Sequence, residues 1–168
     1  MKKIIVCLML FSFVLGAKPI DLSSEGAWKK MESYLVDAKG RRAKGLELES
    51  KDYILVYYSA SWCPPCRKFT PELVKYYNKN ASKYNFEVIL MPSDRSDKAM
   101  EKYMKDYKMP WPGVKLKKVK DSNLAQFGGK FIPRLVLLDK KGKLLAEGEN
   151  ASFKKLEELQ KDNGVTVR

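Results

Sequence analysis

The sequence contains no histidine among its 168 residues. This absence excludes a Ser-His-Asp triad, a Cys-His protease dyad and every zinc or haem site that a histidine would ligate. No apolar run reaches the ~18 residues that an ordinary membrane-spanning helix requires. Hydrophobic residues still make up 45% of the chain, too many for a disordered protein, so length and composition predict one globular domain.

A basic start precedes an apolar stretch at the amino terminus. Lys2 and Lys3 are followed by the uncharged residues 4–16 and then by Ala17. This pattern is typical of a secretory signal peptide, and we expect cleavage after Ala17. The prediction is a signal peptide at residues 1–17 and a domain at residues 18–168 that is periplasmic or secreted. An uncleaved, membrane-anchoring leader is the alternative.

Cleavage changes the cysteine count and the charge. Cys7 leaves with the leader, so Cys63 and Cys66 are the two cysteines of the mature chain. Loss of Lys2 and Lys3 lowers the basic residues from 33 to 31 against 20 acidic ones, and the net charge from +13 to +11. Exported proteins meet an oxidising compartment. A bridge between cysteines three residues apart closes too small a loop to stabilise a fold, so a reactive pair is the leading interpretation.

The hydrophobic pattern alternates between strands and helices. Strands are expected at residues 34–36, 46–48, 53–60, 86–91, 135–139 and 144–147, and helices at 24–31, 65–80, 96–107 and 152–161, with a helical turn at 124–127. The continuous apolar runs at 53–60 and 86–91 are typical of strands buried on both faces. Residues 34–36 and 46–48 flank a glycine turn, so we expect them to pair. Ser96 and Ser152 are the expected N-caps, and the whole forms one α/β domain.

The candidate reactive residues lie where the predicted strand 53–60 ends and the predicted helix 65–80 begins. The junction reads Trp62-Cys63-Pro64-Pro65-Cys66. A cysteine at a helix N-terminus meets free N–H groups and the positive end of the dipole, which lowers its pKa from ~8.5 toward neutrality. Pro64 and Pro65 fit a first helical turn, where a missing N–H costs nothing. Cys63 is therefore the predicted nucleophile, and the more buried Cys66 is predicted to resolve the mixed disulfide.

Three alternative roles for the cysteine pair are less favoured by the sequence. A zinc site needs four ligands, whereas the mature chain offers two thiols and no histidine, so we expect no metal and no cofactor. A structural disulfide or a chance pair remain as alternatives.

The segment at residues 57–71 reads YYSASWCPPCRKFTP, which resembles the active-site segment of the tryparedoxin/nucleoredoxin branch of the thioredoxin superfamily. Further matches are Met109-Pro110-Trp111 and Phe131-Ile132-Pro133. The resemblance covers about residues 46–148 and implies a thioredoxin-like fold, a central mixed β-sheet flanked by helices. It also implies a cis Pro133 facing the cysteines, with the backbone of Ile132 free to pair with a substrate strand.

The resemblance assigns supporting roles and leaves one open. Tyr57 stands six residues before the first cysteine, where thioredoxins carry a buried aspartate, so the group that deprotonates Cys66 is undetermined, with Glu72 a candidate. Trp62 is expected to pack beside Cys63 and limit its exposure.

Two further features have competing interpretations. Arg67 and Lys68 either favour the thiolate through their charge or form a solvated helical turn. Trp111 either lines the rim of the site or packs in the core.

These observations predict a protein-disulfide oxidoreductase that acts on exported proteins. The missing histidine between the cysteines favours the reducing direction. The partners expected are disulfide- or dithiol-containing proteins and an upstream electron donor, either a membrane reductase or a thioredoxin-like protein. We expect a monomer that binds no nucleic acid, whose charge attracts anionic surfaces or acidic partners. A binding or chaperone module without disulfide turnover, and a dedicated cytochrome-maturation-type thiol reductant, are the alternatives.

Overall fold

The computed structural model of the protein describes residues 20–162. The expected signal peptide and its cleavage site lie outside the described residues and stay a prediction. Within residues 20–162, none of the helices is both long and apolar enough to cross a membrane.

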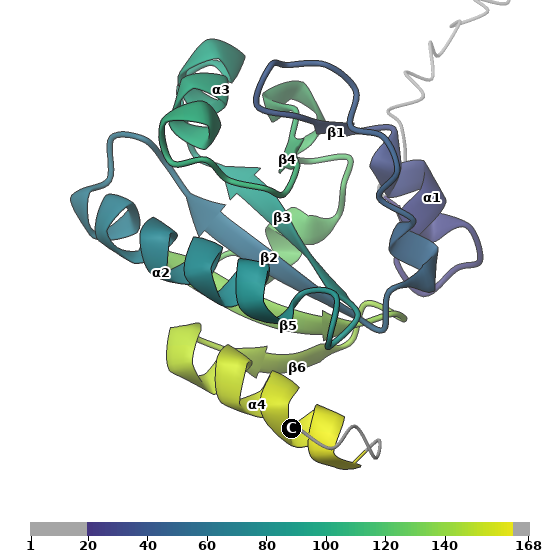
Figure 1. Cartoon of the computed structure of the whole chain (residues 1–168). Coiled ribbons are helices and arrows are strands. Elements are labelled where there is room, and N and C mark those ends of the chain that lie inside the picture. The colour runs from purple at the N-terminus through teal and green to yellow at the C-terminus, as the bar shows by residue number, and fades with distance from the viewer. Residues whose placement is uncertain (1–19, 163–168) are drawn as a thin grey trace, which may run out of the picture.

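One mixed sheet of six strands forms the centre of the fold, in the order β1-β4-β3-β2-β5-β6 (Figure 1). The strands are β1 (Leu35–Val36), β2 (Tyr53–Ser59), β3 (Phe86–Pro92), β4 (Gly113–Val114), β5 (Arg134–Asp139) and β6 (Leu144–Glu147). The central strand β2 runs parallel to β3 and antiparallel to β5. Every residue of β2 and β3 is buried, as expected for apolar strands covered on both faces. The predicted mixed sheet flanked by helices is thus confirmed.

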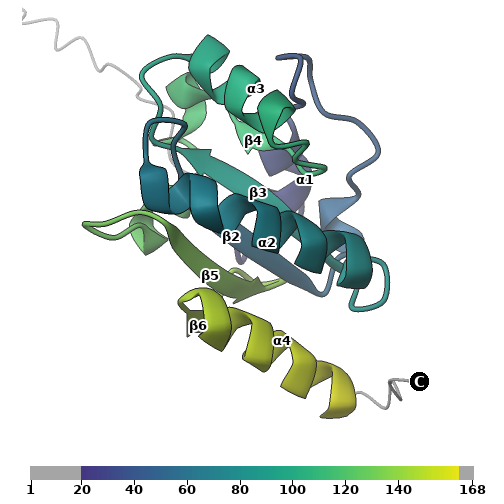
Figure 2. The same cartoon turned by 60° about the vertical axis from the view of Figure 1, so that its left-hand side comes forward.

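Four helices cover the two faces of this sheet (Figure 2). They are α1 (Ala27–Glu32), α2 (Pro64–Asn80), α3 (Asp97–Asp106) and α4 (Glu149–Asp162). Tyr53, Leu55 and Tyr57 of β2 pack in one core cluster with residues of α2, α3 and α4. The alternate residues Ile54 and Val56 pack in the other cluster, with residues of α1. Side chains alternate between faces along a strand, so one apolar run supplies both cores.

The expected pairing of residues 34–36 with 46–48 was wrong. Strand β1 instead pairs antiparallel with β4, a two-residue strand too short to give a periodic signal. Residues Leu48–Ser50 form a 3-10 turn, which follows Glu47 in the left-handed region at φ 49°. The N–H of Leu48 donates to the Glu32 carboxylate at 2.7 Å, so it is not available to a strand partner.

One of the two expected helix caps is present. Ser96 Oγ accepts the N–H of Ala99 at 3.2 Å and caps α3, as predicted. Ser152 is not a cap, because α4 begins at Glu149. Ser152 lies within α4 instead, its side chain is buried, and its hydroxyl donates to the carbonyl of Leu135 on β5 at 3.4 Å.

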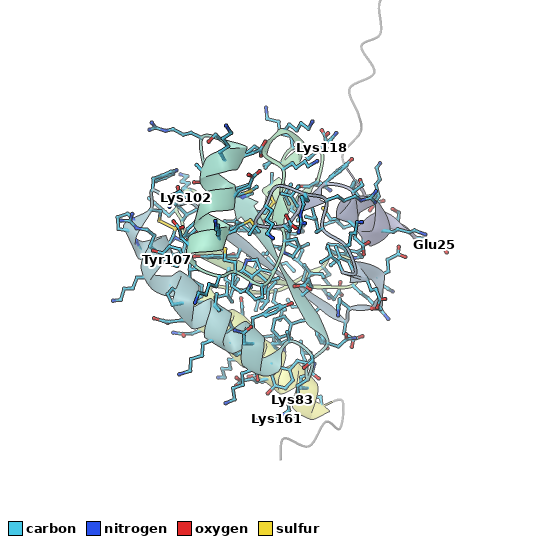
Figure 3. All side chains as sticks on the ribbon, turned by 45° about the horizontal axis from the view of Figure 1, so that its top comes forward. Glu25, Lys83, Lys102, Tyr107, Lys118 and Lys161 are labelled. Carbon is cyan, nitrogen blue, oxygen red and sulfur yellow. A yellow bond between two sulfur atoms is a disulfide. The ribbon has the colours of Figure 1, made fainter. Side chains whose placement is uncertain are left out.

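The excess basic side chains are spread over the surface. Figure 3 shows Lys102 on α3, Lys118 after β4, and Lys83 and Lys161 together at the opposite end of the molecule. Lys102 and Lys118 pair with nearby aspartates. This dispersal is typical of a solvated basic surface.

Candidate active site

Cys63 lies at the junction that the sequence predicted. Strand β2 ends at Ser59 and α2 begins at Pro64, so Cys63 is the N-cap residue of the 17-residue helix α2. Its N–H donates to the carbonyl of Ala60 at 3.1 Å, and its Sγ accepts the N–H of Cys66 at 3.3 Å. The sulfur thus occupies the place of a capping oxygen, where helix N–H groups favour a negative charge.

Cys63 and Cys66 form a disulfide, with Cα atoms 5.2 Å apart. Cys63 is 3% exposed and Cys66 is fully buried, so Cys63 is the slightly more exposed residue of the pair. Both pack with Ala60 and with the half-buried Ile132. This difference in burial fits the expected division into an attacking and a resolving cysteine.

The loop before β5, which contains Ile132 and Pro133, also lies beside the disulfide. The Ile132–Pro133 peptide bond is cis, as the resemblance implies. The carbonyl oxygen of Ile132 lies 3.7 Å from Cys63 Sγ. The backbone of Ile132 therefore lies beside Cys63, and its pairing with a substrate strand stays a prediction.

Trp62 is 56% exposed and stands beside Cys63. Its Nε1–H donates to the carbonyl of Ser93 at 3.1 Å. The indole is therefore held by Ser93, directly after β3, and its expected role in limiting the exposure of Cys63 stays a prediction.

Asp94 is a supporting residue that sequence reasoning missed. It is 7% exposed, and its Oδ1 accepts the N–H of Ser61 at 3.0 Å and the Ser61 hydroxyl at 2.6 Å. These bonds fix the turn before Cys63 to the end of β3. The signal available in the sequence was an aspartate two residues after the end of a buried strand, because ligands of α/β sheets bind at the carboxyl ends of the strands.

A buried hydroxyl network lies behind Cys66. Tyr57 OH donates to the carbonyl of Cys66 at 3.2 Å and contacts Thr70 Oγ1 at 3.0 Å. Thr70 donates to the same carbonyl at 2.8 Å and lies 2.6 Å from Tyr103 OH, which in turn lies 3.0 Å from Ser59 Oγ. Burial raises the pKa of Tyr57 well above its ordinary value. Tyr57 therefore stays protonated, and the network holds the backbone carbonyl of Cys66 through its hydrogen bonds.

The remaining predicted residues lie further from the chemistry. Arg67 is exposed on the first turn of α2. Glu72 is also exposed, lines a groove toward α4, and has no hydrogen bond to Cys66 among the described residues.

The expectation that Trp111 lines the rim of the site is corrected by its burial. Trp111 is 2% exposed and packs edge-on against Tyr77 in the core, which supports the core alternative. The reason is that β4 turns the preceding loop inward, with Pro112 O accepting the N–H of Leu90 at 2.9 Å.

No group of three or more Cys, Asp or Glu side chains that could hold a metal ion is found within residues 20–162.

A mixed sheet with a Cys-x-x-Cys disulfide at a helix N-terminus, facing a cis-proline, defines a thioredoxin-fold thiol oxidoreductase. A family model described as thioredoxin-like matches residues 51–144. The chain belongs to this thioredoxin-like family and is tryparedoxin/nucleoredoxin-like within it.

Relatives and solved structures agree on this placement. Probable nucleoredoxin 1 of Arabidopsis thaliana is 37% identical over 116 residues, which are 68% of this chain and 20% of that protein. The tryparedoxin of Trypanosoma brucei brucei is 39% identical over 88 residues, 51% of this chain and 60% of that protein. The match thus spans about a fifth of the nucleoredoxin.

Among solved structures, tryparedoxin II of C. fasciculata superposes with a TM-score of 0.64 at 28% identity, covering 84% of this chain and 93% of that one. Thioredoxin of Wuchereria bancrofti gives a TM-score of 0.62 at 27% identity, covering 79% and 94%.

Proposed function

We propose that this protein reduces disulfides in exported proteins through the Cys63–Cys66 pair. The observation that carries the proposal is the position of Cys63. Cys63 Sγ caps α2, and the carbonyl oxygen of Ile132 lies 3.7 Å from this sulfur. A substrate chain passing along Ile132 brings its own sulfur to Cys63, and the helix terminus favours the thiolate that attacks.

The reducing reaction has two exchanges. The Cys63 thiolate attacks one sulfur of the substrate disulfide, so that bond breaks, a Cys63–substrate disulfide forms, and the second substrate sulfur leaves as a thiolate. Cys66 then gives up its proton and attacks Cys63 Sγ, which releases the first substrate sulfur. Two electrons pass from the protein to the substrate, and the protein is left with its Cys63–Cys66 disulfide.

The proton of Cys66 needs an acceptor. Tyr57, whose hydroxyl contacts the carbonyl of Cys66, is a poor acceptor, because burial raises its pKa well above the ordinary value and keeps it protonated. We infer that the acceptor is the substrate thiolate released in the first exchange, whose ordinary pKa of ~8.5 suits it to take a thiol proton.

The direction and the cellular place are part of the proposal. The basic and apolar residues at 1–17 support export, and the absence of a histidine between the cysteines supports the reducing direction. Reduction requires a dithiol donor, either a membrane reductase or a thioredoxin-like protein, that returns two electrons to the Cys63–Cys66 disulfide by the same exchange.

Insulin reduction by dithiothreitol tests the chemistry. Wild-type protein is expected to accelerate the turbidity that follows insulin reduction, and Cys63→Ser to lose this acceleration. Cys66→Ser retains the attacking sulfur but cannot release the substrate, so mixed disulfides should accumulate on non-reducing gels. Full activity in Cys63→Ser would refute the proposal. Partner capture unaffected by either substitution, without turnover, would indicate a binding module instead.

The direction is tested in cells by alkylating free thiols with a mass tag. A reductase is expected to hold Cys63 and Cys66 mostly reduced. A mostly oxidised pair would show that the protein runs as an oxidase.

A further inference from the structure

Large apolar side chains are exposed at three places within residues 20–162. They are Trp62 at 56%, Phe131 at 83% and Leu144 at 40%. Trp62 precedes Cys63, and Phe131 precedes Ile132, whose carbonyl lies 3.7 Å from Cys63 Sγ. Two of the three are thus the sequence neighbours of residues at the disulfide, on separate loops, and both stay exposed although burying such rings would be favourable. Exposed apolar side chains gathered at one site are typical of an interaction surface.

Phe131 also borders a hollow. A cavity of about 500 Å³ lies between the loop of Phe131 and Pro133 and the segment Gly148–Ala151 at the start of α4. Because Pro133 lines this cavity and follows Ile132, a chain that passes along the Ile132 backbone runs next to it. The cavity falls within the size range of ordinary ligand pockets, so it has room for a large side chain.

Arg134 makes a hydrogen bond to the segment before Phe131 and an ion pair with β6. Arg134 donates from Nε to the carbonyl of Phe127 at 2.8 Å, and its guanidinium pairs with Glu147 on β6. A Cβ on Gly129 would lie 3.0 Å from Arg134 Nη1, so the loop backbone passes close over this side chain. These contacts hold the start of the loop at residues 127–129, and the Arg134 charge at the wall of the cavity is already paired with Glu147.

We propose that Phe131 determines substrate specificity by holding a large apolar side chain next to the reactive cysteine of an extended protein segment. This proposal rests on the proposed function and names its substrate class. The segment lies along the Ile132 backbone, its sulfur meets Cys63, and the neighbouring aromatic or long aliphatic side chain packs on Phe131 in the cavity. Trp62 contacts the segment on the other side of the disulfide.

The experiment measures the reduced protein on peptide disulfides. Short peptides carry one cysteine joined to thionitrobenzoate and either Phe or Ser beside that cysteine, with the Phe placed before it or after it in turn. With the reduced protein in excess over the peptide, attack at the peptide sulfur releases one coloured thionitrobenzoate per peptide. The rate of this release gives the second-order rate constant of the first exchange. Variants are Phe131→Ser, the conservative Phe131→Leu, and Leu144→Ala, which removes the exposed apolar side chain that lies away from the disulfide on β6.

The wild type is expected to prefer at least one Phe peptide over its Ser counterpart by about tenfold, the upper end of what an aromatic pair contributes. Phe131→Ser should abolish the preference, Phe131→Leu should keep part of it, and Leu144→Ala should keep all of it. Leu144→Ala should also reduce 2-hydroxyethyl disulfide, which carries no amino-acid side chain, at the wild-type rate. The same substrate reports whether each Phe131 variant keeps the disulfide chemistry.

An equal preference in wild type and Phe131→Ser would overturn the specificity proposal and leave the disulfide chemistry standing. Failure of wild-type protein to reduce any of these disulfides would instead overturn the proposed function. Loss of 2-hydroxyethyl disulfide reduction in Phe131→Ser would show that the residue supports the site itself and would also refute a role in specificity.

Discussion

The hydroxyl network behind Cys66 predicts that two similar substitutions differ in cost. Thr70 has one hydroxyl proton, which goes to the carbonyl of Cys66 at 2.8 Å. At its 2.6 Å contact with Tyr103, Thr70 must therefore accept, so Tyr103 donates to Thr70 and Ser59 donates to Tyr103. Every hydroxyl proton in this buried chain has an acceptor.

Thr70→Val keeps the side-chain shape and removes the acceptor of Tyr103. If Tyr103 then turns its proton toward Ser59, the Ser59 proton loses its acceptor instead, so one buried donor stays unpaired in either arrangement. Loss of the hydrogen bond from Thr70 to the carbonyl of Cys66 costs about 1 kcal/mol, and the unpaired buried donor costs about 1–3 kcal/mol. Thr70→Val should therefore lower the free energy of unfolding by about 2–4 kcal/mol.

Tyr57→Phe removes a donor and leaves no donor behind. The carbonyl of Cys66 still accepts from Thr70. The expected loss is therefore about 1 kcal/mol, the ordinary net value of one hydrogen bond.

Urea denaturation of the oxidised proteins at 25 °C, with equal slopes, measures both losses. Thr70→Val should unfold at a clearly lower urea concentration than Tyr57→Phe. If Tyr57→Phe is equally or more destabilising, the proton assignment in the network is wrong.

Two further perturbations follow from the structure. Glu87 is 7% exposed, and burial raises its pKa above the ordinary 4.5, so the folded state favours its protonated form and stability falls as pH rises from 4.5 through the folded pKa. Glu87→Gln should therefore stabilise the protein at pH 7 in urea melts, with a gain that shrinks below about pH 4.5; a gain independent of pH would contradict this reasoning. Gly142 and Gly45 both have positive φ, at 75° and 67°, but only a Cβ at Gly142 meets a neighbour, 2.5 Å from Leu22 Cβ. Gly45→Ala should cost about 1–2 kcal/mol and Gly142→Ala clearly more, and equal melting points would show that the contact with Leu22 relaxes freely.

Much of the local structure was predictable because its signals lie within short segments. The apolar run at 53–60 gave β2, and the spacing of Phe69 and Leu73 gave α2. Residues 46–48 were misassigned as a strand because a bond to Glu32, sixteen residues away, takes the N–H of Leu48. Strand β4 was missed because its two residues carry no period and exist through pairing with β1 and β3.

The site divides in the same way. Neighbouring residues alone indicated the cysteine pair, its prolines and its place at a helix start, because a helix N-terminus is formed by residues adjacent in the chain. Tertiary structure decided what surrounds the pair. Asp94 fixes the active-site turn from thirty-three residues away, and the carbonyl of Ile132 reaches Cys63 from sixty-nine residues away. It also decided that Trp111 is buried and Phe131 exposed. The order in which strands pair sets which distant loops meet, and neither composition nor period encodes that order locally.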